Sequence, residues 1–324
     1  MKPRILITRA VFPEHLARLE ACFDVESNQS DAQFTPTELA RRLSDRDGAL
    51  VAAGDRMDAA MLAAAPSLRV VSTISVGTNH IDVAACRARG VLVTNTPDVL
   101  TETTADFAWA LIMAAARRVT ESERWLREGK WQRWSLDQFL GADVHHATLG
   151  ILGMGRIGQA IARRASGFAM RVVYHNRSRL PEEIERACRA EYVAKDALFA
   201  EADHLIVVVP YAPENHHVVG ARELAAMKPT ATLTNIARGG LIDETALADA
   251  LAHGRLGAAG LDVFEGEPTI NPALLALDNI VLTPHIGSAS RATRNAMGHL
   301  AIDNLIAALD GQRPVNFVNA EAMR

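Results

Sequence analysis

The segment Thr148-Leu-Gly-Ile-Leu-Gly-Met-Gly-Arg-Ile-Gly158 decides the fold of this chain. Its short apolar run ends on Gly153-Met-Gly155-Arg-Ile-Gly158, after which apolar residues recur at helical spacing. The pattern predicts a strand, a glycine turn and a helix. Gly153 would permit the tight turn, Gly155 would let the backbone approach a pyrophosphate, and Gly158 would allow the helix to pack closely on the strand. Free N–H groups at the helix start would face the anion, so the segment predicts a dinucleotide site.

Composition excludes several classes of protein. The chain has 324 residues and a formal net charge of −4, with 49% hydrophobic residues. This length predicts about two domains, and the charge argues against a nucleic-acid partner. The longest apolar stretches are too short to span a bilayer, so no membrane partner is expected. Three cysteines without metal-ligand or CxxC spacing predict reduced thiols in a cytoplasmic protein.

Strand and helix patterns alternate along the chain, which predicts parallel sheets. Strands are expected at residues 4–8, 49–53, 69–75, 91–95, 149–152, 171–175, 205–210, 231–237, 257–264 and 279–284. We therefore predict two doubly wound α/β domains with a cleft between them. Residues 1–100 and 288–324 would form a flavodoxin-like substrate domain, because the last helix and a short apolar tail return to it. Residues 101–287 would form a Rossmann cofactor domain.

A single long helix is expected from Thr101 through Arg118 and on toward Arg127. It is too apolar to be exposed, so it would pack between domains or against another subunit. The irregular segment that follows carries Trp131 and Trp134. Such an arm either lies at an interface or folds back on its own domain.

Polar residues follow the apolar strands of the second domain, at Gly153, Asn176 to Arg179, Pro210, Arg238, Asp262 and His285. Ligands of open α/β sheets bind outside the carboxyl ends of the strands, so these residues are expected to converge. After the strand at 171–175, where NAD enzymes place a carboxylate, the chain has Asn176, Arg177, Ser178 and Arg179 instead. These side chains suit a 2′-phosphate, which predicts NADP(H) over NAD(H). Two solvated arginines on a turn are the alternative.

Three further residues are the parts needed to move a hydride onto a 2-keto acid. Arg238 would pair with the substrate carboxylate and polarise its carbonyl, and His285 would protonate the developing alkoxide. Glu267 would hold the imidazolium. Each residue taken alone has an ordinary structural explanation. Arg238 could form a surface ion pair, Glu267 could be a solvated carboxylate in a loop, and His285 could cap the end of a strand.

Together these motifs resemble the D-isomer-specific 2-hydroxyacid dehydrogenase family over essentially the whole chain. The resemblance rests on the glycine loop, Ile74-Ser-Val-Gly-Thr-Asn-His-Ile-Asp82, Asn235-Ile-Ala-Arg-Gly-Gly240, Gly260-Leu-Asp-Val-Phe-Glu-Gly-Glu-Pro268 and Pro284-His-Ile-Gly-Ser288. It implies that Arg238, Glu267 and His285 are catalytic, and that the backbone N–H groups of Val76 and Gly77 bind the substrate carboxylate. It also implies a homodimer held through the cofactor domain. The expected cofactor-binding residues are Thr104, Gly153, Gly155, Arg156, Ile157, Gly158, Asn176, Arg177, Ser178, Arg179, Val209, Pro210, His216, Ile236, Ala237, Arg238, Asp262, His285 and Gly287.

Within the family the chain is most similar to bacterial glyoxylate/hydroxypyruvate reductases, which also reduce 2-ketogluconate and prefer NADPH. A departure at Thr78-Asn79-His80 leaves the keto acid open. The alternatives are an NAD(H)-sensing corepressor-like protein, which keeps the same triad, and a 3-phosphoglycerate dehydrogenase, which would need basic residues near Val76. No metal site is expected, because the adjacent histidines of His145-His146 and His216-His217 should point apart and no third ligand lies at ligand spacing.

Overall fold

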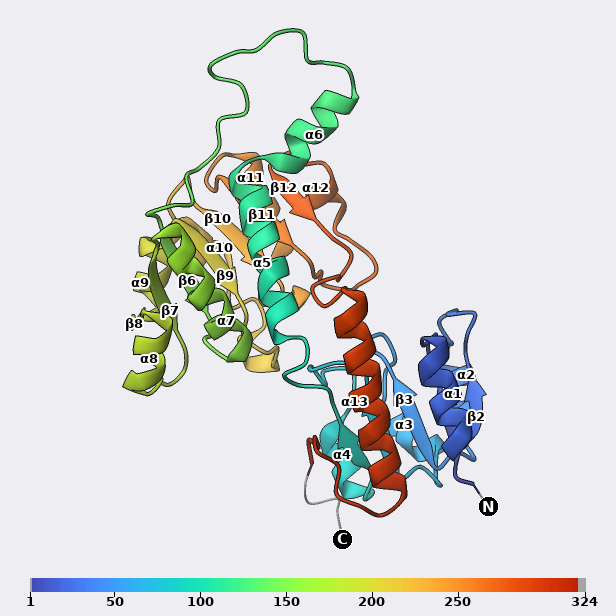
Figure 1. Ribbon diagram of the computed structural model, residues 1–324. Helices are drawn as coiled ribbons and strands as arrows, with labels where there is room; N and C mark the ends of the chain where they lie inside the picture. Colours follow the sequence, from blue (N-terminus) through green and yellow to red (C-terminus); the bar gives the residue numbers. More distant parts are fainter. Residues whose placement is uncertain (1, 320–324) are drawn as a thin grey trace. The chain divides into compact units, whose positions relative to one another are not determined.

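The computed structural model describes residues 2–319, which form two compact units (Figure 1). Unit 1 contains the residues up to Leu100 together with those from Ser290 onward, and unit 2 is Thr101–Ala289. The second boundary lies two residues later than the predicted one. The chain passes from unit 1 to unit 2 at Thr101, where a long helix begins. It returns to unit 1 at Ser290, one residue before another long helix.

Unit 1 is built on a five-stranded parallel sheet in the order β2-β1-β3-β4-β5. Its strands are β1 (Arg4–Ile7), β2 (Asp24–Ser27), β3 (Gly48–Val51), β4 (Val70–Thr73) and β5 (Leu92–Thr94). Its helices are α1 (Pro13–Cys22), α2 (Pro36–Leu43), α3 (Ala59–Ala64), α4 (Val83–Ala88) and α13 (Arg291–Leu309). This strand order is the flavodoxin-like order, which confirms the predicted fold of this unit.

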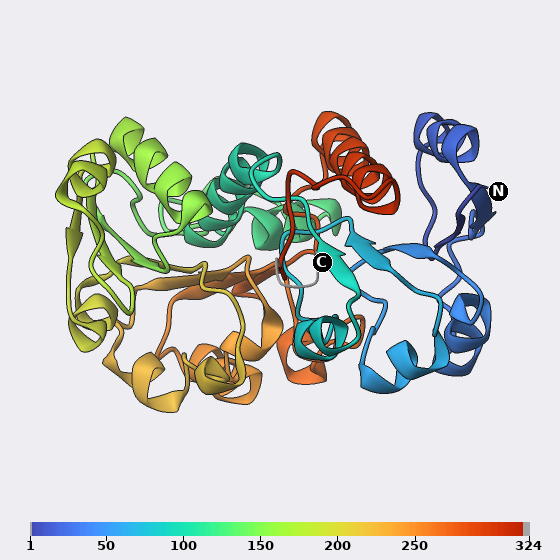
Figure 2. The same cartoon turned by 90° about the horizontal axis from the view of Figure 1, so that it is seen from below.

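Helices cover both faces of the unit 1 sheet, with α1 and α13 on one face and α2, α3 and α4 on the other (Figure 2). Successive residues of a strand point to opposite faces, so β1 must be apolar throughout. Ile5 and Ile7 pack in the core under α1 and α13, whereas Leu6 packs under α2 and α3. The tail after α13 returns to this sheet, where the Val318 N–H donates to the Val93 carbonyl.

Unit 2 is built on a seven-stranded parallel sheet in the order β12-β11-β10-β9-β6-β7-β8. Its strands are β6 (Thr148–Leu152), β7 (Arg171–His175), β8 (Ala190–Tyr192), β9 (His204–Val207), β10 (Thr232–Asn235), β11 (Ala258–Leu261) and β12 (Ile280–Leu282). Its helices are α5 (Thr101–Ala116), α6 (Val119–Arg127), α7 (Arg156–Ala165), α8 (Glu182–Cys188), α9 (Lys195–Glu201), α10 (Ala221–Ala226), α11 (Glu244–Ala252) and α12 (Pro272–Leu275). This is the predicted doubly wound cofactor domain.

The edge strands β2 and β8 were absent from the prediction. Each lies at the end of its sheet, and neither has a buried residue in its middle. Without a buried face the apolar pattern that announces a strand is missing. Two edge strands therefore escaped detection from sequence.

The prediction of one long helix through Arg127 was wrong. Helix α5 ends at Ala116, and Arg118 turns the chain with a left-handed φ of 53° before α6 begins. Helix α5 buries one face in the core of unit 2, where it packs on α7, β10 and β11, whereas α6 buries no residue. The buried face of α5 therefore belongs to the core of unit 2.

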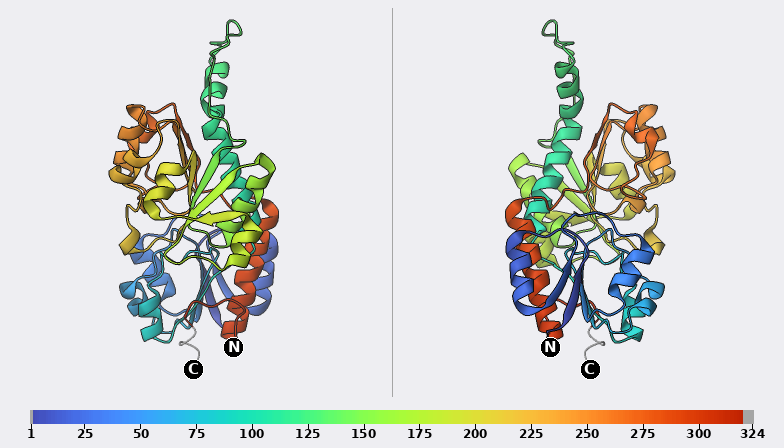
Figure 3. Two further views of the ribbon diagram at one scale, coloured as in Figure 1. Left: turned by 90° about the vertical axis from the view of Figure 1, so that its left-hand side faces the viewer. Right: turned by 90° about the vertical axis from the view of Figure 1, so that its right-hand side faces the viewer.

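Helix α6 and the segment after it extend away from the sheet of unit 2 (Figures 1 and 3). Trp131 is 56% exposed, Trp134 73%, Leu136 81% and Leu140 67%. Two arrangements were predicted for this arm, at an interface or folded back on its own domain. The second is not observed. Within residues 2–319, no helix combines the length and the apolar character needed to cross a membrane.

Candidate active site

The glycine loop between β6 and α7 is shaped by close backbone contacts. Gly153 has a φ of 106°, and a Cβ there would lie 2.7 Å from the backbone nitrogen of Val209. A Cβ at Gly158 would lie 2.4 Å from the carbonyl oxygen of Gly153. Both positions therefore require glycine. Helix α7 begins at Arg156, so the backbone N–H groups of its first turn point toward the glycine loop, where helix starts of this kind bind anions.

The six strand-end groups predicted from the sequence follow parallel strands of one sheet. Gly153 follows β6, Asn176 follows β7, and Pro210 lies three residues after β9. Arg238, Asp262 and His285 come after the neighbouring strands β10, β11 and β12. All the strands run the same way, so these residues lie at the carboxyl edge of the sheet, where such folds bind ligands.

The turn after β7 has more internal structure than the sequence suggested. The Asn176 side-chain oxygen accepts from the Met154 N–H at 2.7 Å, which ties this turn to the glycine loop. Arg179 is not free for a phosphate, because its Nε and Nη2 donate to the Glu185 carboxylate at 2.9 and 2.7 Å. The Arg179 contact, with a second bond from the Tyr174 hydroxyl, holds the pKa of Glu185 below its ordinary value. Arg177 is exposed, and Ser178 beside it is exposed too.

Arg238 is positioned by the buried Asn235 at the end of β10. The Asn235 side chain accepts from the Ala237 N–H at 3.0 Å and donates to the Arg238 carbonyl at 2.8 Å, which fixes the loop. Burial lowers the pKa of the Arg238 guanidinium, and the nearby charge of Glu267 opposes that effect only in part. An arginine so placed stays protonated at neutral pH and presents a planar fork for a carboxylate.

Glu267 and His285 form a hydrogen-bonded pair. The Glu267 Oε1 accepts from the Phe264 N–H at 2.9 Å, and its Oε2 lies 2.8 Å from the His285 Nδ1. Burial acts to raise the pKa of Glu267, but the hydrogen bond and charge of His285 outweigh it, so the pKa lies below its ordinary value. Glu267 is therefore ionised at neutral pH and binds Nδ1–H. The other ring nitrogen, Nε2, is left to deliver a proton.

Asp262 performs a task that the sequence analysis missed. Its buried carboxylate accepts from the Thr283 hydroxyl at 2.8 Å, from the Ile286 N–H at 2.8 Å and from the Gly287 N–H at 2.7 Å. Its carbonyl accepts from the His285 N–H at 2.9 Å. His285 has a left-handed φ of 53°, an uncommon conformation that these bonds maintain. Burial raises the pKa of Asp262 despite the hydrogen bonds.

Both carboxylate oxygens of Asp262 bind the loop that carries His285, which gives Asp262 a positioning role, and its contact with the cofactor stays a prediction. A sequence signal was present. An acidic residue directly after a buried apolar strand needs internal partners. Thr104 on α5 lies beside the same loop, because a Cβ at Gly287 would be 3.6 Å from the Thr104 Cγ2.

The remaining predicted residues line the neighbouring loops. Val209 packs next to Gly153, whereas Ile236 and Ala237 belong to the loop that Asn235 fixes. His216 and His217 do not point apart as expected, since their rings stack with centroids 3.8 Å apart. A third potential ligand, Glu265, lies beside them. The expectation that these two side chains point apart was therefore wrong, and the third group comes from a distant part of the chain that sequence spacing does not reveal.

Val76 and Gly77 lie in unit 1, after β4. The Val76 carbonyl accepts from the Asn95 amide at 2.9 Å, and the Gly77 carbonyl accepts from the Ser75 hydroxyl at 2.7 Å. The loop is thereby held in one conformation. His80, which departs from the family pattern, is within 3.0 Å of the Thr73 hydroxyl through its Nε2.

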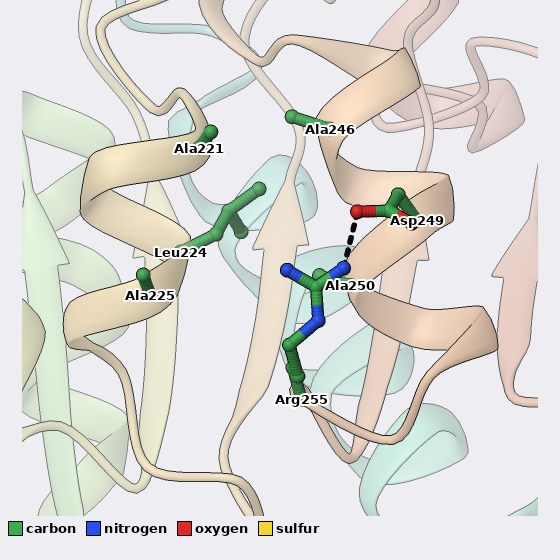
Figure 4. Close-up of a pocket in the computed structure, with 7 residues that line it drawn as sticks. All are labelled: Ala221, Leu224, Ala225, Ala246, Asp249, Ala250 and Arg255. Carbon is green, nitrogen blue, oxygen red and sulfur yellow. Dashed lines mark hydrogen bonds and ion pairs between the residues drawn. The ribbon is translucent and has the colours of Figure 1, made fainter.

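A small depression between α10 and α11 contains none of the predicted site residues (Figure 4). Alanine methyl groups form most of its wall, and its one ion pair, between Arg255 and Asp249, is satisfied internally. Ligand sites need convergent polar groups, so this depression is not the active site. Its lining residues are Ala221, Leu224, Ala225, Ala246, Asp249, Ala250 and Arg255.

Comparison with known proteins tests the resemblance. The family model for the D-isomer specific 2-hydroxyacid dehydrogenase, NAD binding domain, matches residues 109–287. The glyoxylate reductases of Thermococcus onnurineus and Korarchaeum cryptofilum are 44% and 46% identical to this chain, over 100% of it and 98% of each relative. This chain belongs to the D-isomer specific 2-hydroxyacid dehydrogenases.

A solved structure of the family supports the same conclusion. The NADPH-dependent glyoxylate/hydroxypyruvate reductase of Sinorhizobium meliloti, in complex with NADP and malonate, is 36% identical. It superposes with a TM-score of 0.89 over 99% of this chain and 98% of that one. As a 2-hydroxyacid dehydrogenase, the protein is an oxidoreductase that uses a nicotinamide dinucleotide, and the predicted fold and family are confirmed.

Proposed function

We propose that this 2-hydroxyacid dehydrogenase reduces small 2-keto acids to D-2-hydroxy acids with NADPH. The proposed substrates are glyoxylate, hydroxypyruvate and 2-ketogluconate. The observation that carries the proposal is the 2.8 Å contact of Glu267 with His285, with Arg238 after the neighbouring strand β10. The similarity to glyoxylate reductases supports the choice of substrate class.

In the proposed reaction the bound dinucleotide supplies a hydride to the carbonyl carbon. The Arg238 fork pairs with the substrate carboxylate and polarises the carbonyl, which favours negative charge on its oxygen. His285 gives its Nε2 proton to that oxygen, so the product is a neutral hydroxyl group. Glu267 stabilises the imidazolium form before the transfer. Oxidation of the hydroxy acid is the reverse, with His285 accepting the proton.

The carboxyl edge of the unit 2 sheet fits a dinucleotide. The first turn of α7 offers N–H groups for the pyrophosphate, and the glycines there leave no side chain in the way. We propose that Arg177 and Ser178 bind a 2′-phosphate, because both are exposed and no carboxylate follows β7. Arg179 contributes only if it leaves Glu185. The relative from Sinorhizobium meliloti contains NADP.

The cofactor preference can be tested by substitution. Arg177→Ala should raise the KM for NADPH about tenfold to a hundredfold, since a hydrogen bond to a charged group contributes roughly 1.5–3 kcal/mol. The KM for NADH should stay unchanged. Arg189→Ala is a matched control, because Arg189 is also an exposed arginine but lies directly before β8, at the opposite, amino edge of the sheet. An equal loss with both cofactors would argue against a phosphate contact.

We further propose a homodimer formed through the arm of unit 2. Large apolar side chains of α6 and the segment after it are exposed, and an exposed patch of this kind marks an interaction site. The members of this patch are Val119, Leu126, Trp131, Trp134, Leu136 and Leu140.

The substrate contacts of Val76 and Gly77 are proposed from the family resemblance. A cytoplasmic location is proposed because the three cysteines are unpaired.

The assay that tests the proposed function measures initial rates of NADPH and NADH oxidation in parallel, with each of the three keto acids. Rapid turnover with NADPH supports both the reaction and the cofactor. Turnover with NADH alone refutes the role of Arg177. Absence of turnover with either cofactor refutes the substrate class.

A further inference from the structure

Two histidines and a glutamate meet in unit 2 beside the catalytic turn. His216 and His217 follow the short 3-10 turn η2 (Pro213–Asn215), and Glu265 lies four residues after β11. The His217 Nε2 lies 2.8 Å from one Glu265 oxygen, and the His216 Nε2 lies 3.7 Å from the other. One ligand atom of each residue lies within 4.8 Å of the other two, and no other such trio occurs within residues 2–319.

The spacing of these atoms suits a transition metal. Bonds of about 2.0–2.1 Å in a tetrahedral site place two ligand atoms roughly 3.3 Å apart. Each histidine Nε2 lies near that distance from one oxygen of the Glu265 carboxylate, His217 at 2.8 Å and His216 at 3.7 Å from the other oxygen, so a small rotation of the carboxylate would present one oxygen to an ion held by both rings. Two imidazoles with one carboxylate are a donor set for Zn²⁺, whereas Mg²⁺ and Ca²⁺ prefer oxygen ligands alone.

Neighbouring groups hold the three side chains in place. The His216 Nδ1 lies 3.3 Å from the Tyr211 hydroxyl, which can accept Nδ1–H and leave Nε2 for a metal. The His217 N–H donates to the Gly240 carbonyl at 2.8 Å. The Glu265 N–H donates to the buried Glu244 carboxylate at 2.6 Å. Ligands on two separate loops are thus fixed by backbone contacts.

Close backbone packing keeps these loops together. A Cβ at Gly239 would lie 1.8 Å from the carbonyl carbon of Phe264, and one at Gly240 would lie 3.3 Å from the His216 Nδ1. The Arg238-Gly239-Gly240 loop therefore fits between the histidines and the Glu265 turn only because both residues are glycine. A shift of Glu265 would also move Glu267, which lies two residues further along the chain.

We propose that this protein binds one divalent transition-metal ion of the Zn²⁺ class through His216, His217 and Glu265, with water completing the coordination. The ion would replace the hydrogen bond between His217 and Glu265. A half-exposed site with three protein ligands keeps an open position. The proposed ion takes no part in the hydride transfer itself, and its test needs neither substrate nor cofactor.

The experiment is a titration of the full chain, freed of metal by a chelator, with Co²⁺. Tetrahedral Co²⁺ absorbs visible light strongly, so binding is read directly, and Zn²⁺ is then added to displace it. The expected result is one Co²⁺ per chain and full displacement by Zn²⁺. His217→Gln and Glu265→Gln should each weaken Co²⁺ binding at least about tenfold, since even outer partners of a metal ligand contribute that much.

A matched control comes from the second pair of adjacent histidines. His145 lies 3.7 Å from Asp143, but the His145 and His146 rings are 5.2 Å apart and perpendicular, and within residues 2–319 these side chains do not form a trio of ligand atoms like that of His216, His217 and Glu265. His145→Gln should leave Co²⁺ binding unchanged. The proposal is overturned if the wild-type chain binds no Co²⁺, or if His145→Gln reduces binding as much as His217→Gln and Glu265→Gln do. Circular dichroism shows whether each variant is folded. If either His217→Gln or Glu265→Gln fails to fold, the Co²⁺ affinity of the other variant tests the proposal.

Discussion

Replacing Glu267 by glutamine removes one charge from the active site and keeps the shape of the side chain. In the structure one carboxylate oxygen accepts from the Phe264 N–H and the other from the His285 Nδ1. An amide has only one oxygen, so it can satisfy one of these donors and must turn its NH₂ group toward the other. In either orientation the imidazolium of His285 loses its anionic partner.

The size of the effect follows from the type of hydrogen bond that is lost. A bond to a charged group contributes roughly 1.5–3 kcal/mol and a neutral one roughly 0.5–1.5 kcal/mol, a difference of about 1–1.5 kcal/mol. Since 1.36 kcal/mol corresponds to about a tenfold change in rate, kcat/KM for keto-acid reduction should fall about tenfold in Glu267→Gln. The rate falls because His285 donates a proton from the positively charged imidazole, which the Glu267 carboxylate stabilises.

The assay compares kcat/KM at neutral pH for wild type, Glu267→Gln, His285→Ala and the double variant. With His285 absent, Glu267→Gln should have little further effect on the rate, because the two residues act as a unit. Stability gives a second measurement. The pKa of Glu267 is below 4.5, so its stabilisation is present above that pH and is lost as the pH falls through the lowered value. The difference in free energy of unfolding between wild type and Glu267→Gln should therefore shrink in acid.

An unchanged kcat/KM in Glu267→Gln would refute this role of the carboxylate. So would additive effects of the two substitutions, which would mean that Glu267 acts independently of His285. Thermal melting curves and NADPH binding by fluorescence show whether each variant is folded and still competent to bind cofactor.

Three further predictions concern the scaffold. Asp262→Ala removes the acceptor of the Ile286 and Gly287 N–H groups and should lower the free energy of unfolding by about 2–3 kcal/mol, measured by urea unfolding, together with kcat, whereas the Thr283 hydroxyl can still donate to the Leu261 carbonyl. Gly158→Ala should destabilise the protein by about 1–3 kcal/mol and weaken NADPH binding, because the new Cβ meets the Gly153 carbonyl, whereas Gly167→Ala, where nothing lies within 4 Å, should change neither. Trp134→Glu should shift sedimentation from dimer toward monomer, and a profile identical to wild type would count against the proposed interface.

Much of the fold could be predicted because its buried strands carry strong local patterns. Strands such as β6 and β9 are buried on both faces, so they appear in the sequence as continuous apolar runs. The glycine loop could be recognised from the spacing of its glycines, and the contacts at Gly153 and Gly158 give the physical reason for that spacing. The edge strands and the interruption between α5 and α6 at Arg118 have no comparable signal, since neither produces a regular spacing of apolar residues in the sequence.

The candidate site was predictable where a residue type is tied to a strand end, as for Arg238, Glu267 and His285. What the sequence could not show were the side-chain contacts made by the fold. Arg179 and Glu185 are six residues apart but meet because of the way the chain turns from β7 into α8, and this contact changes which arginine is free for a phosphate. The meeting of Glu265 with the two histidines likewise depends on loops that only the fold brings together.

The most direct test of the central claim is the reduction of hydroxypyruvate by NADPH, followed by chiral analysis of the glycerate formed. The account predicts rapid NADPH oxidation with D-glycerate as the product, and a kcat lower by orders of magnitude in His285→Ala with cofactor affinity nearly intact. Formation of L-glycerate, or an unaltered kcat in His285→Ala, would contradict it.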